Sequence, residues 1–192
     1  MAGRQARILT PAQLNTAIRH VRGHSNPVRS RVIILLSVKA GLRAAEIAKL
    51  EWPMLLDPIG RVAHSMAIEN RIAKKGGGRI LPIHPDLRKA LIKLHHQVDN
   101  HTGSVIQSAC GGPMRPNSIV NWFIALFAEL GFDGCSSHSG RRTFITAAAR
   151  CAHKAHGSLR DVQLLAGHRS IETTQSYIDG DSSAQRRLIA LI

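Results

Sequence analysis

The sequence is poor in aromatic residues, in cysteine and in long apolar runs. Aromatic residues make up 4% of the 192 residues and include a single tyrosine, which gives little support to a protein that stacks the bases of single strands. The three cysteines, Cys110, Cys135 and Cys151, form no C-x-x-C pair, and an odd, scattered set indicates a reducing compartment. The apolar run at residues 32–36 is too short to span a membrane, and no secretory signal is visible. We therefore expect a cytoplasmic protein without a membrane anchor.

Acidic residues are also scarce. The chain has 12 Asp and Glu against 26 Lys and Arg, a formal net charge of +14. This imbalance favours an anionic partner, and nucleic acid is the first candidate. The basic residues are spread along the chain, which is typical of a basic face on a folded domain. The length predicts one domain, and 44% apolar residues are enough for a core.

Helix signals dominate the chain. Thr10-Pro-Ala-Gln13 is a capping box that predicts a helix with one apolar face. Further helices are expected from residue 27 to about 40, at 44–50, from 85 to about 94, at 116–130, at 159–166, and from Ser170 through Tyr177. Strands are expected at 60–68 and 79–83, with a turn at 74–78, and a short one at 105–108. The predicted fold class is mainly α with a small antiparallel β-sheet (α+β).

Chemistry-bearing side chains gather in the last third of the chain. His138-Ser-Gly-Arg141 places an imidazole and a guanidinium at the start of a helix. Leu165-Ala-Gly-His168 follows, and the only tyrosine, Tyr177, stands nine residues after His168. A guanidinium binds a phosphodiester with two parallel hydrogen bonds. A phenol is a candidate nucleophile, and a histidine can move its proton near neutral pH. The pattern therefore indicates chemistry on a phosphate.

These motifs resemble the carboxyl-terminal boxes of the tyrosine recombinase family, the phage-integrase type. Upstream, Gly41-Leu-Arg43-Ala-Ala-Glu46-Ile resembles the family's first arginine box. Lys74-Lys75-Gly-Gly-Gly-Arg79-Ile-Leu-Pro82 resembles its lysine-bearing β-hairpin. One box alone is a weak signal, whereas all of them in the right order, from about residue 9 to about residue 178, form a strong one. The resemblance implies the fold of the catalytic domain of DNA breaking-rejoining enzymes.

The resemblance also implies how a DNA strand would be cut. Tyr177 would attack the scissile phosphate and form a 3′-phosphotyrosyl bond, which stores the bond energy so that rejoining needs no ATP. His138 would take part in proton transfer with Tyr177. Lys74 would protonate the 5′-oxygen as it leaves. Counting back from Arg79 selects Lys74 by resemblance, whereas the adjacent Lys75, next to the glycines, could reach the phosphate by loop motion.

Other residues would hold the phosphate. Arg43 and Arg141 would donate to its non-bridging oxygens, and His168 would hold it as well. Glu46, three residues after Arg43, would be the supporting acid that orients the arginine or His138. No cofactor and no metal ion is implied.

The implied function is site-specific recombination of double-stranded DNA, as in phage integration and other mobile elements. Four protomers would form a synapse on two duplexes, with accessory DNA-bending proteins as further candidate partners, in the cytoplasm on the nucleoid. Residues 1–8 would be a flexible basic end, 9–180 the catalytic domain, and 181–192 a tail helix for docking on a neighbouring protomer. The family's usual separate amino-terminal DNA-binding domain is not in this sequence, which fits either a natural single-domain enzyme or an excised domain. Type IB topoisomerase-like relaxation and a non-catalytic DNA-binding module are the alternative functions.

Several of these residues have simpler interpretations. Arg43 and Glu46 could form an ordinary surface ion pair. Arg142 could replace Arg141, although the two lie about 100° apart on a helix, so that one facing the site would exclude the other. Tyr177 could be a half-buried core tyrosine.

The remaining histidines raise the alternative of a metal site. The candidate clusters are His20/His24, His95/His96/His101 and His153/His156. Gly23 interrupts the first pair, and no cluster has a cysteine or carboxylate at ligand spacing. We therefore expect these histidines to lie on solvated helix faces.

Overall fold

A computed structural model describes residues 6–73, 76–98, 101–177 and 189–190. It is mostly helical with one two-stranded antiparallel sheet, which confirms the predicted fold class. The elements, in chain order, are α1 (Pro11–His20), η1 (Val21–Gly23), α2 (Pro27–Lys39), α3 (Ala44–Ala48), η2 (Trp52–Met54), β1 (Ser65–Ile68), β2 (Arg79–Pro82), α4 (Pro85–His95), α5 (Pro116–Glu129), α6 (Ser139–Cys151), η4 (Ala152–Ala155), α7 (Leu159–Ala166) and α8 (Ile171–Gln175). Within these described residues, no helix is long and apolar enough to cross a bilayer.

Most of the predicted helix boundaries are confirmed by their caps. Thr10 and Gln13 form the expected capping box of α1, and Ser158 forms one with Asp161 at α7. The side chain of Asn26 caps α2. Proline stands in the first turn of α1, α2, α4 and α5, where its missing N–H costs no intrahelical bond.

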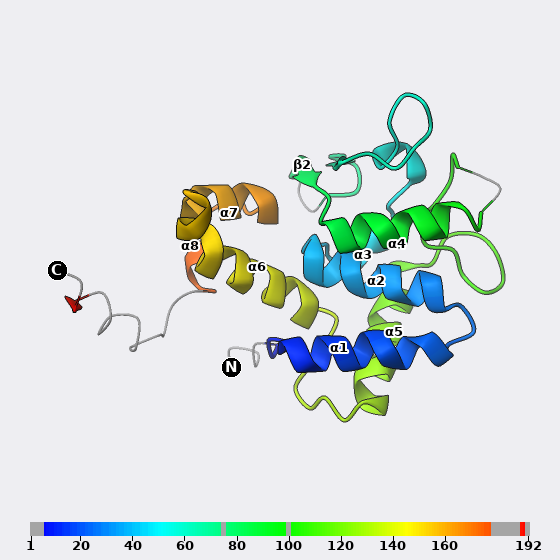
Figure 1. The fold of residues 1–192 in the computed structure, drawn as a ribbon, viewed down its shortest axis with the longest axis horizontal. Helices are drawn as coiled ribbons and strands as arrows, with labels where there is room; N and C mark the ends of the chain where they lie inside the picture. The colour runs from blue at the N-terminus through cyan, green and yellow to red at the C-terminus, as the bar shows by residue number, and fades with distance from the viewer. Residues whose placement is uncertain (1–5, 74–75, 99–100, 178–188, 191–192) are drawn as a thin grey trace.

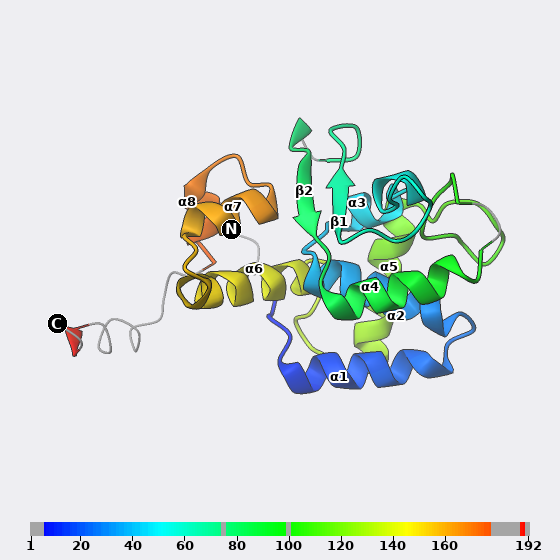
Figure 2. The ribbon, with the colours of Figure 1, turned by 45° about the horizontal axis from the view of Figure 1, so that its top comes forward.

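Helix α2 forms the centre of the main core. Every residue from Val32 to Val38 is buried, because this run is apolar on all sides of the helix. Helices α3, α4 and α6 pack against α2. Figures 1 and 2 show α1 to α5 gathered in one part of the molecule, α7 and α8 at its other end, and α6 running from the first part to the second. The long helix α6 therefore connects the core to the segment that carries His168 and Tyr177.

The two strands form a hairpin whose second strand lies on the side of α7 (Figure 2). Ser65 pairs with Pro82 and Ile68 with Arg79. The prediction that the first strand starts at residue 60 is wrong. The Asp57 carboxylate accepts hydrogen bonds from the backbone N–H groups of Ile59 and Arg61, and this local turn bends the chain before the strand begins.

The predicted strand at 105–108 is also wrong. Isolated bridges join Glu51 to Ser104 and Gln107 to Pro113, but no ladder forms. Gly111 and Gly112 both have positive φ, so the chain turns back before a longer pairing can develop.

Parts of the expected ends lie outside the described residues. In the segment expected to be a flexible basic end, the carbonyl of Ala6 accepts a hydrogen bond from Arg142, and the N–H of Arg7 donates to Gly134 at 3.0 Å. The tail expected at 181–192 is described only at residues 189 and 190.

Candidate active site

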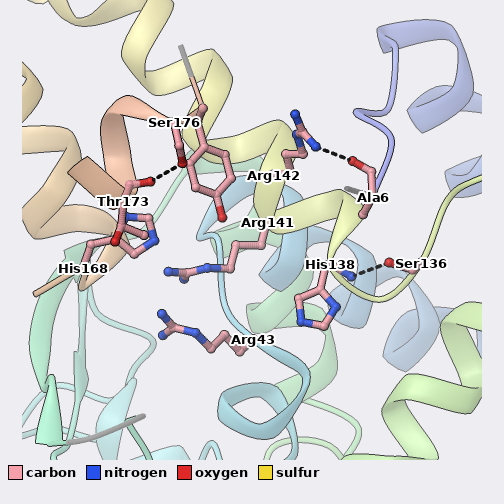
Figure 3. Close-up of a pocket in the computed structure, with 10 residues that line it drawn as sticks. Ala6, Arg43, Ser136, His138, Arg141, Arg142, His168, Thr173 and Ser176 are labelled. Atoms are coloured by element: carbon pink, nitrogen blue, oxygen red, sulfur yellow. Dashed lines mark hydrogen bonds between the residues drawn. The ribbon is translucent and has the colours of Figure 1, made fainter. Parts of the chain in front are cut away.

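A pocket of about 500 Å³ opens where the first turn of α6, the start of α3 and the segment around α8 meet. Figure 3 shows side chains from these segments converging on the same space. Five of the residues singled out from the sequence line the pocket: Arg43, His138, Arg141, His168 and Tyr177. The fold therefore brings together side chains that lie far apart in the chain.

Helix α6 supplies His138 and Arg141. His138 is exposed and stands at the N-cap position. Arg141 is only 4% exposed; its Nη1 donates to the carbonyl of Gly41 at 2.6 Å and its Nη2 to that of Ala166 at 2.7 Å. Within the described part of the chain, these two bonds use two of its five guanidinium N–H groups. Burial, reinforced by the charge of Arg43, lowers the pKa of Arg141 to about 10, which marks a poorly solvated cation that still carries its charge at neutral pH.

Arg43 is held by the carboxylate at the start of α3. Its backbone N–H donates to Glu46 Oε2 at 2.8 Å and its Nη1 to Oε1 at 3.1 Å. Glu46 is 1% exposed, so the interpretation as a surface ion pair is wrong. The same carboxylate also bonds Arg79. These contacts favour one of the two roles expected of Glu46, the orientation of the arginine.

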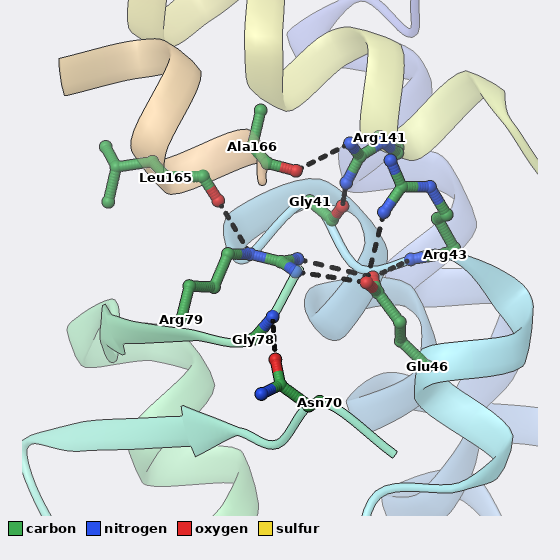
Figure 4. Close-up of polar contacts among 9 residues, drawn as sticks. All are labelled: Gly41, Arg43, Glu46, Asn70, Gly78, Arg79, Arg141, Leu165 and Ala166. Atoms are coloured by element: carbon green, nitrogen blue, oxygen red, sulfur yellow. Dashed lines mark hydrogen bonds and ion pairs between the residues drawn. The ribbon is translucent and has the colours of Figure 1, made fainter. Parts of the chain in front are cut away.

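The contacts of Arg79 with Glu46 and Leu165 are the main feature of the site that the sequence did not reveal. Arg79 opens β2, yet its side chain is only 6% exposed. Figure 4 shows its guanidinium between Glu46, with bonds of 3.0 and 3.3 Å, and the carbonyl of Leu165, which accepts from Nε at 3.0 Å. Burial acts to raise the pKa of Glu46, but hydrogen bonds and charges of Arg79 and Arg43 outweigh it and lower that pKa. No sequence spacing could have paired residues 33 positions apart.

His168 follows directly on the end of α7. Gly167 ends the helix with φ +64°, a conformation that favours glycine. The imidazole Nδ1 lies 3.0 Å from the hydroxyl of Thr174, which is fully buried. Burial, followed by the charges of Arg141 and Arg43, lowers the pKa of His168 to about 4. The imidazole is therefore neutral at pH 7. The sequence showed Thr174 only as one of two adjacent threonines before the tyrosine.

Tyr177 lies beyond the helix that was expected to bear it. Helix α8 ends at Gln175, and the backbone N–H of Tyr177 donates to the carbonyl of Thr174 at 3.2 Å. Its ring stacks on His168 with centroids 5.7 Å apart and packs against the small cluster of Ile145, Val162 and Ala166. The side chain is half-buried and still lines the pocket, so it is both packed and accessible.

Lys74 and Lys75 lie outside the described residues. The hairpin ends near them are defined: the N–H of Gly78 donates to the side chain of Asn70 at 2.9 Å (Figure 4). The role of Lys74 and the choice between the two lysines stay predictions.

Arg142 also lines the pocket. We expected that only one of the two adjacent arginines could face the site, and this is wrong, because the pocket extends around the first turn of α6 to the chain near Ala6. Arg142 Nη1 donates to the Ala6 carbonyl at 3.1 Å (Figure 3). Arg141 is instead buried against α7, so the two guanidinium groups have different surroundings.

Among the described residues, one group could hold a metal ion: His20, His24 and Glu129. Although no carboxylate stands at ligand spacing beside this pair in the sequence, the fold brings Glu129, at the end of α5, to within 2.8 Å of His20. Sequence spacing could not show it, because the two helices meet only in the folded chain. His20 and Glu129 are 36% and 53% exposed and contact each other directly, and none of the three lines the pocket.

This chain is similar in sequence to known proteins of one family. A family model described as the phage integrase family matches residues 7–183. Tyrosine recombinase XerC of Brucella melitensis biotype 1 is 31% identical over 158 residues, which cover 80% of this chain and 47% of that protein. The chain thus spans about half the length of the curated relatives it matches.

Two solved structures show the same fold. The Tn1549 transposon integrase in complex with a circular intermediate DNA superposes with a TM-score of 0.77 at 17% identity, covering 100% of this chain and 67% of that one. A lambda integrase dimer bound to a COC′ core site superposes with a TM-score of 0.69 at 19% identity, covering 94% and 62%.

Proposed function

This chain belongs to the phage integrase family, and on that premise we propose that it is a site-specific recombinase that cuts and rejoins double-stranded DNA through a covalent bond to Tyr177. The observation that carries this proposal is the pocket that combines a phenol, two imidazoles and the guanidinium groups of Arg43 and Arg141. These groups supply a nucleophile, proton carriers and positive charge for a phosphodiester.

In the proposed step the scissile phosphate exchanges its ester bond to the 5′-oxygen for one to Tyr177. The oxygen of Tyr177 attacks the phosphorus and the bond to the 5′-oxygen breaks, which leaves a 3′-phosphotyrosyl link. His138 takes up the phenolic proton, and Lys74 gives a proton to the leaving 5′-oxygen. Rejoining runs the same step in reverse with a 5′-hydroxyl as the attacking group, so no external energy source is consumed.

The surroundings of Arg141 and His168 support their roles at the phosphate. Arg141 is a buried cation whose two carbonyl bonds fix its plane, and a poorly solvated cation attracts an anion more strongly than an exposed one. His168 is neutral at pH 7. When the Thr174 hydroxyl donates to Nδ1, the proton of the imidazole stands on Nε2, which then donates to the phosphate.

The partners are proposed by analogy with the solved relatives. The solved Tn1549 integrase is in complex with a circular intermediate DNA, and the lambda integrase is a dimer bound to a COC′ core site. For this chain we propose double-stranded DNA as the substrate and a homo-oligomer on it, a tetrameric synapse, with residues 9–180 as the catalytic domain and 181–192 docking on a neighbour. Accessory DNA-bending proteins and a cytoplasmic, DNA-associated location belong to the same proposal.

A nicked duplex that loses a short fragment after cleavage tests the activity, because the fragment's departure traps the covalent complex. We expect a protein–DNA adduct on a denaturing gel with the native protein and none with Tyr177→Phe, at equal DNA binding. No adduct with the native protein on DNA carrying its site, or an equal adduct with Tyr177→Phe, would contradict the proposal.

Supercoiled plasmids separate recombination from simple relaxation. A recombinase joins two sites and needs both, whereas a topoisomerase relaxes a plasmid that lacks any site. Efficient relaxation of a plasmid without a site would assign the chain to the second activity.

A further inference from the structure

Arg79 has a charged side chain that is buried, which is uncommon in folded proteins. Its side chain is 6% exposed although the residue opens a strand in which two of the four residues are exposed. A buried guanidinium is stable only when its N–H groups are bonded. All three nitrogens of Arg79 have partners: Nη1 and Nη2 donate to Glu46, and Nε donates to Leu165.

These bonds join three segments that each carry a different part of the candidate site. Glu46 holds Arg43 at the start of α3. Leu165 lies in the last turn of α7, two residues before Gly167 and three before His168. Arg79 itself stands at the start of β2, on the hairpin whose connection contains Lys74. Figure 4 shows the guanidinium as the point where the three segments meet.

The end of α7 is held by two arginines side by side. Arg79 takes the carbonyl of Leu165 and Arg141 takes that of Ala166, both of which lack a partner inside the helix. The guanidinium also leaves no room for a side chain at Gly167, because a Cβ atom added there would lie 2.9 Å from Arg79 Nη1. The direction in which the chain leaves α7 toward His168 therefore depends on Arg79 as well as on Arg141.

Arg79 is not among the residues that line the pocket. All three of its guanidinium nitrogens already bond Glu46 or Leu165. Its contacts act instead on residues that do line the pocket. This arrangement is that of a positioning residue.

We propose that Arg79 positions the phosphate-binding groups for DNA cleavage: through Glu46 it sets the guanidinium of Arg43, and through the end of α7 it sets His168. The proposal rests on the proposed function. The same bonds tie the start of β2 to both segments.

The test uses Arg79→Met, Arg79→Lys, Glu46→Gln and the double variant Glu46→Gln/Arg79→Met. Arg71→Met is the matched control, because Arg71 also bonds two carboxylates, Glu51 and Glu69, but is 52% exposed. The cleavage rate is measured in a single turnover on the nicked duplex at saturating DNA. DNA affinity and melting temperature are measured beside it.

We expect Arg79→Met to slow cleavage by about 100-fold, the effect of misplacing reacting groups by about 1 Å, while DNA affinity changes little. Arg79→Lys should recover only a minor part of the rate, because an ammonium cannot bond a carboxylate and a carbonyl in one plane. In the Glu46→Gln background the Arg79→Met change should cost less than in the native protein, since one of the two links is already broken. Arg71→Met should cleave at the native rate.

A rate for Arg79→Met equal to that of Arg71→Met would overturn the proposal, and so would full recovery with Arg79→Lys, which would show that charge alone matters. If the rate reductions of Glu46→Gln and Arg79→Met simply multiply in the double variant, Arg79 does not act through Glu46.

A second measurement needs no DNA. The backbone N–H groups of Gly167 and His168 close the end of α7 on Leu164 and Gln163, and their hydrogen exchange should speed up in Arg79→Met and Arg79→Lys but not in Arg71→Met. If the native protein forms no adduct, the proposed function fails, and unchanged exchange at these amides would separately overturn the positioning role.

Discussion

Replacing Glu46 by glutamine tests the electrostatic arrangement behind the site. Glu46 is 1% exposed and is the shared counter-ion of Arg43 and Arg79. Removing one partner of a buried ion pair costs about 3–5 kcal/mol. Glutamine keeps the shape and one acceptor oxygen, so we expect a loss near the lower end, about 3 kcal/mol at pH 7. For a chain of this length that loss lowers the melting temperature by roughly 6–12 °C.

The pKa of Glu46 determines how the stability lost in Glu46→Gln changes with pH. The pKa of Glu46 is lowered from its ordinary value of 4.5. Its carboxylate therefore stabilises the folded protein fully above that value, and this contribution is lost as the pH falls through the lower folded pKa. The difference in free energy of unfolding between the native protein and Glu46→Gln should be largest at neutral pH and shrink in acid.

Urea unfolding at a series of pH values measures this difference. Glu51→Gln is the matched control, because Glu51 also bonds an arginine but lies near the surface, and it should change stability little. A loss in Glu46→Gln that is no larger than in Glu51→Gln, or that stays constant as the pH falls below 4.5, would refute the reasoning.

Three further predictions concern binding and catalysis. Thr174→Val removes the hydroxyl beside His168 Nδ1 without changing side-chain size, so cleavage should slow by roughly 10-fold at unchanged DNA affinity; an unchanged rate would show that the hydroxyl does not orient the imidazole. Lys74→Ala should cleave normal DNA slowly and recover on DNA with a 5′-bridging sulfur, because a thiolate leaves without an acid. Lys75→Ala should cleave both substrates only slightly more slowly than the native protein. If Lys75→Ala rather than Lys74→Ala recovers on the sulfur-containing DNA, Lys75 is the acid and the predicted hairpin register is wrong by one residue. The net charge of +14 predicts DNA affinity that falls steeply with salt, and a flat salt titration would contradict a binding mode dominated by phosphate contacts.

The sequence predicted the elements that are set by local chemistry. Capping residues such as Thr10 and Ser158 mark helix starts because their side chains bond backbone groups only three residues away. The uniformly apolar run in α2 predicted its burial for a similar reason. The motif residues of the pocket were recognisable as well, because each box is continuous in sequence.

Contacts between distant segments could not be predicted in this way. Arg79 and Glu46 meet across the hairpin and α3, and Glu129 meets His20 across two helices. A turn held by hydrogen bonds to the Asp57 carboxylate forms where the sequence pattern had predicted the start of a strand. Tyr177 lies beyond α8, where packing against the cluster of Ile145 places it.

The most direct test of the account is to identify the atom that joins protein and DNA. The trapped complex is digested with nuclease and trypsin, and the peptide of residues 170–186 is sequenced by mass spectrometry. This peptide also contains serine and threonine hydroxyls, including Thr173 and Ser176 in the pocket lining. The account predicts a nucleotide mass on Tyr177 alone, with a 5′-hydroxyl on the released strand that a kinase can label. A nucleotide on any other residue, or a link to the 5′-phosphate, would contradict it.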